Sequence, residues 1–437
     1  MNRKVLLIII TLFISCLNLY AQNREVGKKD SQGKKTGLWK VYYEKSGKIK
    51  AQGNFLDGRK TGLWNYYTSK GKWNGSANYL DGKRSGLYQL FWLNKNGDQL
   101  PKEKGNYLND KKFGEWITYS TDWKQSFINT KGTYAKGGIK TGRWEEYKRN
   151  SDQLLKLETF NEQGVLNGPY EERKSNGELK VKGNMLSGKR NGSWILMKNN
   201  GNEKEKMSIT YSKGIKNGPY ELRDDRSNTL IQKGNYQNDK KTGFWESRGS
   251  KNIAKGNYSA DKKVGLWEYF DSSITTNHPT ETAEYASSGT EHIMSLKRFD
   301  ENNKLVLDVS HNPSENGDKS FKQYFPDGTL RVKGQLKYEK KQGPWEEYYP
   351  NGSLGTLKNY SSGKLNGIAK VLYPNGIVKE RINYVNGSIG NVLEMNDING
   401  KKLDPGSLKN GNGTLIIYHD NGTLNKILNI VNGKVQN

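Results

Sequence analysis

Apolar and polar residues alternate with a period of two along much of this chain. Two such series lie close together near its start: Trp39, Val41, Tyr43 and then Ile49, Ala51, Gly53, Phe55. A period of two puts every second side chain on one face of a β-strand, whereas a helix would repeat every 3.6 residues. The pattern therefore predicts strands over residues 39–43 and 49–55, separated by a short turn.

One short string recurs throughout the sequence. LDGRKTGLWNYY, which begins at Leu56, returns as LDGKRSGLYQLF from Leu80, LSGKRNGSWILM from Leu186 and SSGKLNGIAKVL from Ser361. Such regular recurrence indicates a repeat architecture. The large residue two positions after the second glycine recurs every 22–28 residues up to position 267 and then resumes: Trp39, Trp64, Tyr88, Trp116, Trp144, Tyr170, Trp194, Tyr220, Trp245, Trp267, Phe321, Trp345, Ala369, Leu393 and Leu415.

Each repeat contains two turns. A second anchor precedes the next Trp-type residue by nine positions in many repeats, as Phe55 precedes Trp64, and Asp57-Gly58 lies between them. An Asx-Gly pair supplies the positive φ angles of a tight hairpin turn. The rest of the repeat varies in length and often carries Asn-Gly, which is typical of a second, exposed turn. Two turns per repeat predict an all-β fold, an elongated antiparallel meander of about sixteen stacked β-hairpins.

The spacing of the repeats defines the predicted domains. Regular hairpin repeats are expected over residues 22–266 and 321–437, with degenerate repeats or an insertion over 267–320. Only 32% of the chain is hydrophobic and the mean hydropathy is −0.94, values that alone would favour disorder. However, 11% of the residues are aromatic and 50 glycines recur in register. Aromatic side chains bury large areas and can hold a thin structure together.

The first residues are typical of a secretory signal. Arg3 and Lys4 precede a ten-residue apolar run over 5–14, which is too short to span a bilayer. We predict a signal peptide over 1–21 cleaved after Ala21, and we keep lipidation of Cys16 as the alternative. Export would place the protein in the periplasm, at the outer-membrane surface or outside the cell, and no other segment reaches transmembrane length. Cys16 is the only cysteine, so cleavage after Ala21 leaves no thiol for a disulfide or a metal site.

The net charge of +26 allows two interpretations. An anionic partner would be attracted to such a chain. The basic pairs that each repeat places at its tight turn, such as Arg59-Lys60 and Lys83-Arg84, are alternatively explained by solvation, which we favour. The partners that we expect are another protein, an envelope glycan or an anionic lipid. We do not expect nucleic acid, and the oligomeric state stays open.

The repeats resemble a known family. The segments GLWKVYYEKSGKIKAQGNFLDGRKTG and GPWEEYYPNGSLGTLKNYSSGKLNG are similar to the MORN-repeat variant of bacterial proteins that are often labelled antitoxin-like. The resemblance covers most of the chain from about residue 34 to 437, except for the stretch between Trp267 and Phe321. It implies an extended sheet of hairpins that serves as a scaffold or binding module, and the antitoxin label implies neutralisation of a toxin. It carries no catalytic residues.

The residues that could carry chemistry do not form a catalytic motif. GNMLSGKR, from Gly183, is close to a phosphate-binding loop, but its glycines occupy repeat positions and a strand is predicted to follow. Neighbouring glutamates, such as Glu145-Glu146, point to opposite faces of a strand. The histidines have no spacing typical of a metal site: His278, His292, His311 and His419. We therefore predict a non-enzymatic protein with no metal or cofactor.

A second aromatic row offers the candidate ligand contacts. It follows the Trp-type residue by three positions and is therefore predicted on the opposite sheet face. We favour packing for this row and keep ligand contact as the alternative for Tyr42, Tyr67, Phe91, Tyr119, Tyr147 and Tyr348. Trp123 lies outside the repeat positions, in an insertion at a turn.

Three hypotheses for the function follow from these observations. The first is an exported, non-enzymatic scaffold or macromolecule-binding module at the cell envelope. The second is an antitoxin or immunity-type protein that neutralises a toxin. The third, which we rank last, is an envelope enzyme that uses the stretch 267–320.

Overall fold

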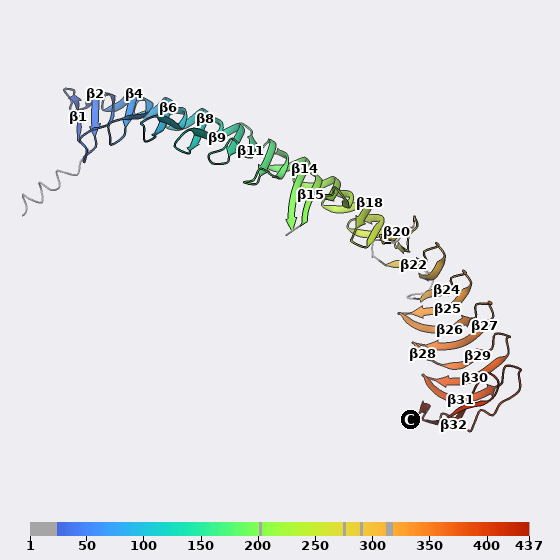
Figure 1. Cartoon of the computed structure of the whole chain (residues 1–437). Helices are drawn as coiled ribbons and strands as arrows, with labels where there is room; N and C mark the ends of the chain where they lie inside the picture. Colours follow the sequence, from blue (N-terminus) through green and yellow to red (C-terminus); the bar gives the residue numbers. More distant parts are fainter. Residues whose placement is uncertain (1–23, 201–202, 274–276, 289–291, 312–317, 437) are drawn as a thin grey trace, which may run out of the picture. The chain divides into compact units, whose positions relative to one another are not determined.

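Tight β-hairpins follow one another in chain order in the computed structural model, which describes residues 24–200, 203–273, 277–288, 292–311 and 318–436 (Figure 1). The predicted signal peptide, with Cys16 and the cleavage site at Ala21, lies outside the described residues. The chain divides into two units. One comprises Met1–Asn217 with Asp224–Arg226, and the other comprises Gly218–Arg223 with Ser227–Asn437.

The first unit contains the strands up to β15. From β1 to β15, consecutive strands pair antiparallel in chain order. The strands are β1 (Glu25–Lys29), β2 (Lys35–Tyr42), β3 (Ile49–Leu56), β4 (Arg59–Tyr67), β5 (Trp73–Leu80), β6 (Lys83–Leu93), β7 (Gln99–Leu108), β8 (Lys111–Thr121), β9 (Ser126–Ala135), β10 (Ile139–Tyr147), β11 (Leu154–Phe160), β12 (Gly168–Arg173), β13 (Leu179–Leu186), β14 (Lys189–Asn200) and β15 (Glu203–Ser212).

The second unit continues the same pattern and ends differently. Most of β16 (Ile215–Asp224) belongs to it and pairs with β17. The strands that follow are β17 (Leu230–Gln237), β18 (Lys240–Arg248), β19 (Asn252–Ser259), β20 (Lys262–Asp271), β21 (Glu281–Tyr285), β22 (Ile293–Phe299), β23 (Leu305–His311), β24 (Asp318–Tyr324), β25 (Leu330–Lys337), β26 (Lys340–Tyr348), β27 (Leu354–Ser361), β28 (Lys364–Leu365), β29 (Gly367–Leu372), β30 (Val378–Val385), β31 (Ser388–Met395), β32 (Gly413–Tyr418), β33 (Leu424–Val431) and β34 (Lys434–Val435). The last three form a separate sheet.

The tight turn of each repeat depends on positive φ angles. Asp57 has φ 48° and Gly58 has φ 76°, as a two-residue hairpin turn requires. The Gly58 N–H also donates to the Lys35 carbonyl of the preceding repeat at 2.9 Å. The same kind of link recurs from Gly82 to Lys60 at 2.9 Å, so successive turns are hydrogen-bonded to one another.

A β-bulge after each tight turn places the tryptophan. Gly62, with φ 63°, lies in the bulge where β3 and β4 change register between Gln52 and Asn54. This geometry folds the Trp64 ring flat over Gly53, where an added Cβ would lie 2.4 Å from the ring atom Cδ2. The two glycines therefore have different tasks. Gly62 supplies the positive φ, and Gly53 supplies the space.

The core is a row of such rings. Trp64, Trp116, Trp194 and Trp245 are at most 2% exposed. The separate C-terminal sheet packs on β31 through a second small core, which contains Met395, Leu408, Leu415 and Ile430. The described residues contain no helix, and the all-β antiparallel meander of hairpins predicted from the sequence is confirmed.

Two details differ from the simple repeat pattern. Over 267–320, strands β21 to β24 pair in chain order like the other hairpins. In contrast, Leu393 does not act as an anchor, because it is 45% exposed beside a bulge of β31 while Val392 packs on the C-terminal core. The bulge shifts the inward position by one residue.

Candidate ligand-binding surface

The tryptophan side chains of the repeat row pack and hydrogen-bond within the fold. The Trp64 indole N–H donates to the Asn54 carbonyl at 3.1 Å, and the ring meets Phe55 edge to face at 5.2 Å. Trp116, Trp194, Trp267 and Trp345 repeat this hydrogen bond to the carbonyl ten residues earlier. With glycine beneath and rings beside them, these tryptophans stabilise the fold and present little surface to a ligand.

A cation covers the outer side of the tryptophan rings. The charged atom lies 4.0–4.7 Å from the ring centroid and belongs to the residue four positions earlier. Lys60 also lies 5.0 Å from the Tyr79 ring of the next repeat, so it bridges two repeats. Burial against the rings lowers the pKa of the Lys60 and Lys241 ammonium groups. The residues are Lys35, Lys60, Lys112, Lys140, Arg190, Lys241, Lys263 and Lys341.

The assignment of both turn charges to solvation was therefore wrong for one residue of each pair. Arg59 is exposed and forms an ion pair with Asp81 at 2.5 Å. Lys60, its neighbour, points to the other face and packs on aromatic rings as a cation–π partner. The fixed four-residue spacing between this lysine and the tryptophan was the signal in the sequence.

The second aromatic row lies on the face opposite the tryptophans, and its members are half-buried. The Tyr67 hydroxyl accepts a hydrogen bond from the Gln52 amide. Gly53 faces the Trp64 ring, so the adjacent Gln52 side chain points to the opposite face of the sheet. Phe91 packs on Trp73 with ring centroids 5.4 Å apart, and Tyr42 lies 6.0 Å from the Arg24 guanidinium. Each of these aromatic residues therefore contacts a neighbouring part of the chain rather than another member of the row.

Two further members of the row are held by glutamates. The Tyr147 hydroxyl donates to Glu145 at 2.9 Å, and the Tyr348 hydroxyl donates to Glu346. Burial, followed by the hydrogen bond to the carboxylate, raises the pKa of both phenols. Among the described residues, no two of the six candidate aromatics make a ring contact with each other, so the row is not gathered into one site.

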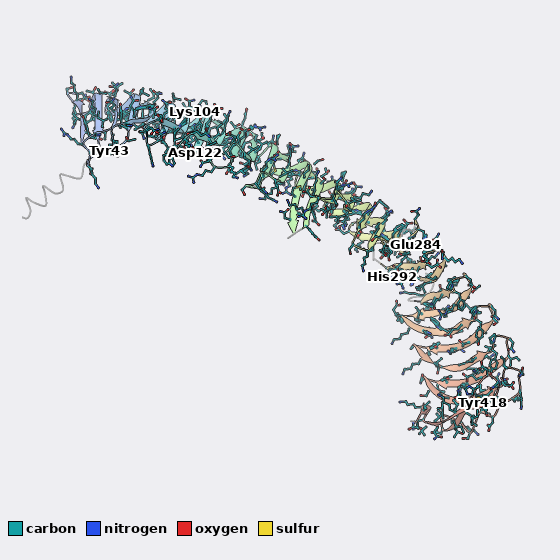
Figure 2. The ribbon with its side chains drawn as sticks, in the orientation of Figure 1. Tyr43, Lys104, Asp122, Glu284, His292 and Tyr418 are labelled. Atoms are coloured by element: carbon teal, nitrogen blue, oxygen red, sulfur yellow. The ribbon has the colours of Figure 1, made fainter. Side chains whose placement is uncertain are left out.

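Tyr119, the remaining candidate, borders a surface depression in the first unit. The depression has a volume of about 300 Å³ and lies near the ends of β6 and β8 and the start of β9. It lies beside the turn that contains Asp122, which is labelled in Figure 2. It combines aromatic rings with polar groups, and it contains Trp123, which lies outside the repeat pattern. Its lining consists of Trp92, Tyr119, Ser120, Thr121, Trp123, Asn129 and Arg149.

The turn over 122–125 displays Trp123 in an unusual conformation. Trp123 is 58% exposed and has φ 72°, a left-handed angle that a bulky side chain rarely adopts. Asp122 holds the turn, because its Oδ1 accepts the N–H groups of Lys124 and Gln125 at 2.9 Å each. These backbone donors lower the pKa of the Asp122 carboxyl. Trp123 N–H donates to Thr121 Oγ1 at 2.9 Å.

Several polar groups of the depression are open. The Tyr119 hydroxyl, the Asn129 amide and the Arg149 guanidinium have no hydrogen-bond partner among the described residues. The floor, in contrast, is fixed: Ser120 is buried and its Oγ accepts the Asn150 N–H at 2.9 Å. Trp92, Asn129 and Arg149 could not be found from the sequence, since their convergence depends on strand register rather than on a motif.

The histidines are distributed between two environments. His278 contacts the backbone carbonyls of Pro279 and Glu301 at 3.3 and 3.1 Å, and His419 lies in a turn of the C-terminal sheet. His292 and His311, which the sequence placed in the irregular stretch, have ring centroids 4.8 Å apart. No group of three or more His, Cys, Asp or Glu side chains suited to a metal occurs in the part of the chain that the structure describes.

The adjacent glutamates separate as strand geometry requires. Glu171 contacts Arg173 at 2.6 Å and Lys182 at 3.2 Å, whereas Glu172 contacts Lys180 at 3.0 Å and accepts the Tyr170 hydroxyl. At Glu171, burial alone would raise the pKa of the carboxyl, but the hydrogen bonds and charges of Arg173 and Lys182 outweigh it, so the pKa is lowered. At Glu172, the hydrogen bond from the Tyr170 hydroxyl is the largest cause of a lowered pKa. Both groups are therefore ionised at neutral pH.

Comparison with known proteins supports the repeat assignment. The family model described as MORN repeat variant matches residues 341–361 and 365–386, which contain β27, β29 and β30, most of β26 and one residue of β28. This match supports a MORN-repeat protein. No curated protein matches the chain.

One solved structure shows a remote likeness. The structure titled "Crystal Structure of TcdB2-TccC3-TEV" is 10% identical over 92% of this chain, with a TM-score of 0.14. The present chain spans 22% of that protein's length. A likeness at this TM-score is no basis for assigning a fold or a function. No helix within the described ranges is long and apolar enough to cross a membrane.

Proposed function

We propose that this protein is a non-enzymatic binding protein of the cell envelope, exported by the segment over residues 1–21. Its hairpin repeats form a scaffold, and exposed side chains at the ends of the hairpins bind another macromolecule. The observation that carries this proposal is the depression around Trp92, Tyr119 and Trp123, where open polar groups surround an exposed ring. The MORN-variant match supports it, since such repeats suggest a binding module.

The site chemistry also favours binding over catalysis. Glu171 and Glu246 are ion-paired and have lowered pKa values, so these two carboxylates are poor proton donors at neutral pH. The tryptophans and lysines of the core row are occupied with one another. Binding through a pre-formed surface does not require a side chain whose pKa is shifted to suit proton transfer.

Fractionation and capture test the two parts of the proposal. Fractionation with mass spectrometry of the mature N-terminus should locate the protein in the envelope or the medium and identify a chain that begins at residue 22. Crosslinking capture from an envelope extract, at low and high salt, should return a specific partner in at least one condition. A cytoplasmic protein with an intact N-terminus contradicts export, and capture at background level in both conditions contradicts the binding role.

The antitoxin alternative rests on the resemblance of the repeats to antitoxin-like proteins. It predicts a toxin encoded beside the gene and a growth defect when the gene is deleted. A deletion strain that grows normally, with no toxin-like neighbour, excludes it.

The enzyme alternative is favoured by one observation, the contact between His292 and His311 in the stretch 267–320. It predicts metal content or turnover on glycans or peptides that His292→Ala abolishes. Unchanged zinc content and the absence of turnover in the wild-type protein exclude it.

A further inference from the structure

We infer that the depression around Trp92, Tyr119 and Trp123 is a carbohydrate-binding subsite that takes a sugar carrying a carboxylate. This inference rests on the proposed binding function and names the class of ligand. The volume of about 300 Å³ is at the lower end of small-molecule sites, which suits one or two sugar rings.

Trp123 is placed for a ligand rather than for the core. The core tryptophans have a glycine beneath them and a cation above, whereas Trp123 is 58% exposed on a turn. Its φ of 72° costs conformational energy, and such strain persists where the surroundings hold it, often at binding sites. The hydrogen bonds of Asp122 and Thr121 supply that support.

Aromatic rings and open polar groups together match a sugar. The C–H faces of a pyranose ring carry partial positive charge and pack on the negative face of an aromatic ring. The Asn129 amide offers donors and an acceptor, and the Tyr119 hydroxyl offers both, which suits sugar hydroxyls. Because the Ser120 and Thr121 hydroxyls are already hydrogen-bonded, the floor keeps its shape when the ligand binds.

The charges at the rim select an acidic sugar. The exposed Arg149 guanidinium has no carboxylate partner among the described residues, and its planar donors match a carboxylate. Lys102 adds a second positive charge, since its Nζ lies 5.7 Å from the Trp92 ring centroid. A nucleic acid fits less well, because single strands require a continuous basic groove with successive stacking platforms, whereas this site is a single depression.

An oligosaccharide array tests the inference on the mature chain, residues 22–437. The array carries oligomers of galacturonate, glucuronate and guluronate beside neutral oligosaccharides of equal length, with a single-stranded oligonucleotide as a further probe. We expect at least one acidic oligomer to bind more tightly than its neutral counterpart. Trp123→Ala and Tyr119→Ala should each weaken that binding about tenfold or more, and Arg149→Gln should remove the preference for the acidic oligomer.

Matched variants separate the site from general effects. Phe244→Ala removes an exposed ring of the other unit, and Lys83→Gln removes an exposed charge, and both should leave binding unchanged. Circular dichroism and the thermal midpoint should match the wild type for Trp123→Ala. The inference is overturned if no acidic oligomer exceeds its neutral counterpart, if the oligonucleotide binds best, or if Trp123→Ala binds normally. An array failure with successful capture from envelope extract overturns this inference alone, whereas failure of both also overturns the proposed function.

Discussion

At the scale of the residue, two glycines and a tryptophan define the repeat. Gly53 lies beneath the Trp64 ring, and the ring buries completely because no side chain stands in its way. The sequence showed that the glycines recur in register. It did not show which of them supplies positive φ and which supplies space, because both tasks select the same residue.

The close contact between Gly53 and Trp64 predicts a severe effect of one methyl group. Gly53→Ala places a Cβ 2.4 Å from the ring, which must move out of its packed position. We expect a loss of about 2–3 kcal/mol in the free energy of unfolding, as for overpacked cores. Urea unfolding followed by circular dichroism measures this loss.

Gly352 provides the matched control for that substitution. It has φ 82° and nothing within 4 Å of an added Cβ, so Gly352→Ala suffers only backbone strain of about 1 kcal/mol. Equal losses for the two variants would show that backbone conformation, rather than the Trp64 ring, explains why glycine recurs at this position of the repeat.

At the scale of the element, the hairpin was predictable and its bulge was not. The nine-residue connector and its Asp-Gly pair indicated a tight turn, and the structure has one. The bulge at Gly62 changes which side chains face each other, so it brings Lys60 over the Trp64 ring. Strand alternation alone could not reveal that contact, because the register is set by hydrogen bonding between strands.

Because Lys60 packs on aromatic rings and Arg59 is exposed, we expect substitutions of these two adjacent residues to change the stability by different amounts. Lys60→Met keeps the apolar stem and removes the charge. Loss of the cation–π contact, partly offset because no ammonium group is then buried, should cost about 1 kcal/mol of stability. Arg59→Met should cost about 0.5 kcal/mol or less, because the Arg59–Asp81 pair is exposed. Thermal unfolding of the two variants measures the difference. A larger loss for Arg59→Met would contradict the assignment.

The free energy of unfolding should decline at alkaline pH because Tyr88 is buried as a neutral phenol. Burial raises the pKa of its phenol from 10.0 to about 12. The unfolded chain loses this proton first, so the contribution of Tyr88 is complete below pH 10 and is lost as the pH rises to about 12. Urea midpoints should therefore fall across this interval, and less steeply in Tyr88→Phe. An identical slope in the two proteins would show that Tyr88 does not titrate with folding.

At the scale of the whole molecule, the order of the strands follows directly from the repeats. From β2 to β5, for example, each strand pairs with the next one along the chain, as the regular spacing of the anchors predicted. The depression at Trp123 was not predictable as a site. The sequence pointed to Tyr119 and Trp123 separately. Trp92 and Arg149 come close to them only because consecutive strands from β6 through β10 pair with one another.

Nearest-neighbour pairing predicts that a complete repeat can be removed. Deleting residues 57–80 joins Leu56 to Asp81 and restores the LDG turn, so every strand keeps its direction. We expect a β-rich, cooperatively unfolding protein. Deleting residues 57–68 instead removes a single strand, which reverses all later pairings and should abolish cooperative unfolding. Circular dichroism with thermal melting distinguishes the outcomes, and equal tolerance of both deletions would contradict the repeat register.

Hydrogen exchange of the chain over residues 22–437, with and without solubilised envelope material, shows directly where a partner binds. If the tryptophan row supports the fold and exposed hairpin ends bind the partner, new protection is expected in the segments 90–93, 119–130 and 147–150. Exchange at the tryptophan positions should stay unchanged. Protection that spares these segments, or that is confined to residues 292–311, would contradict this assignment of roles.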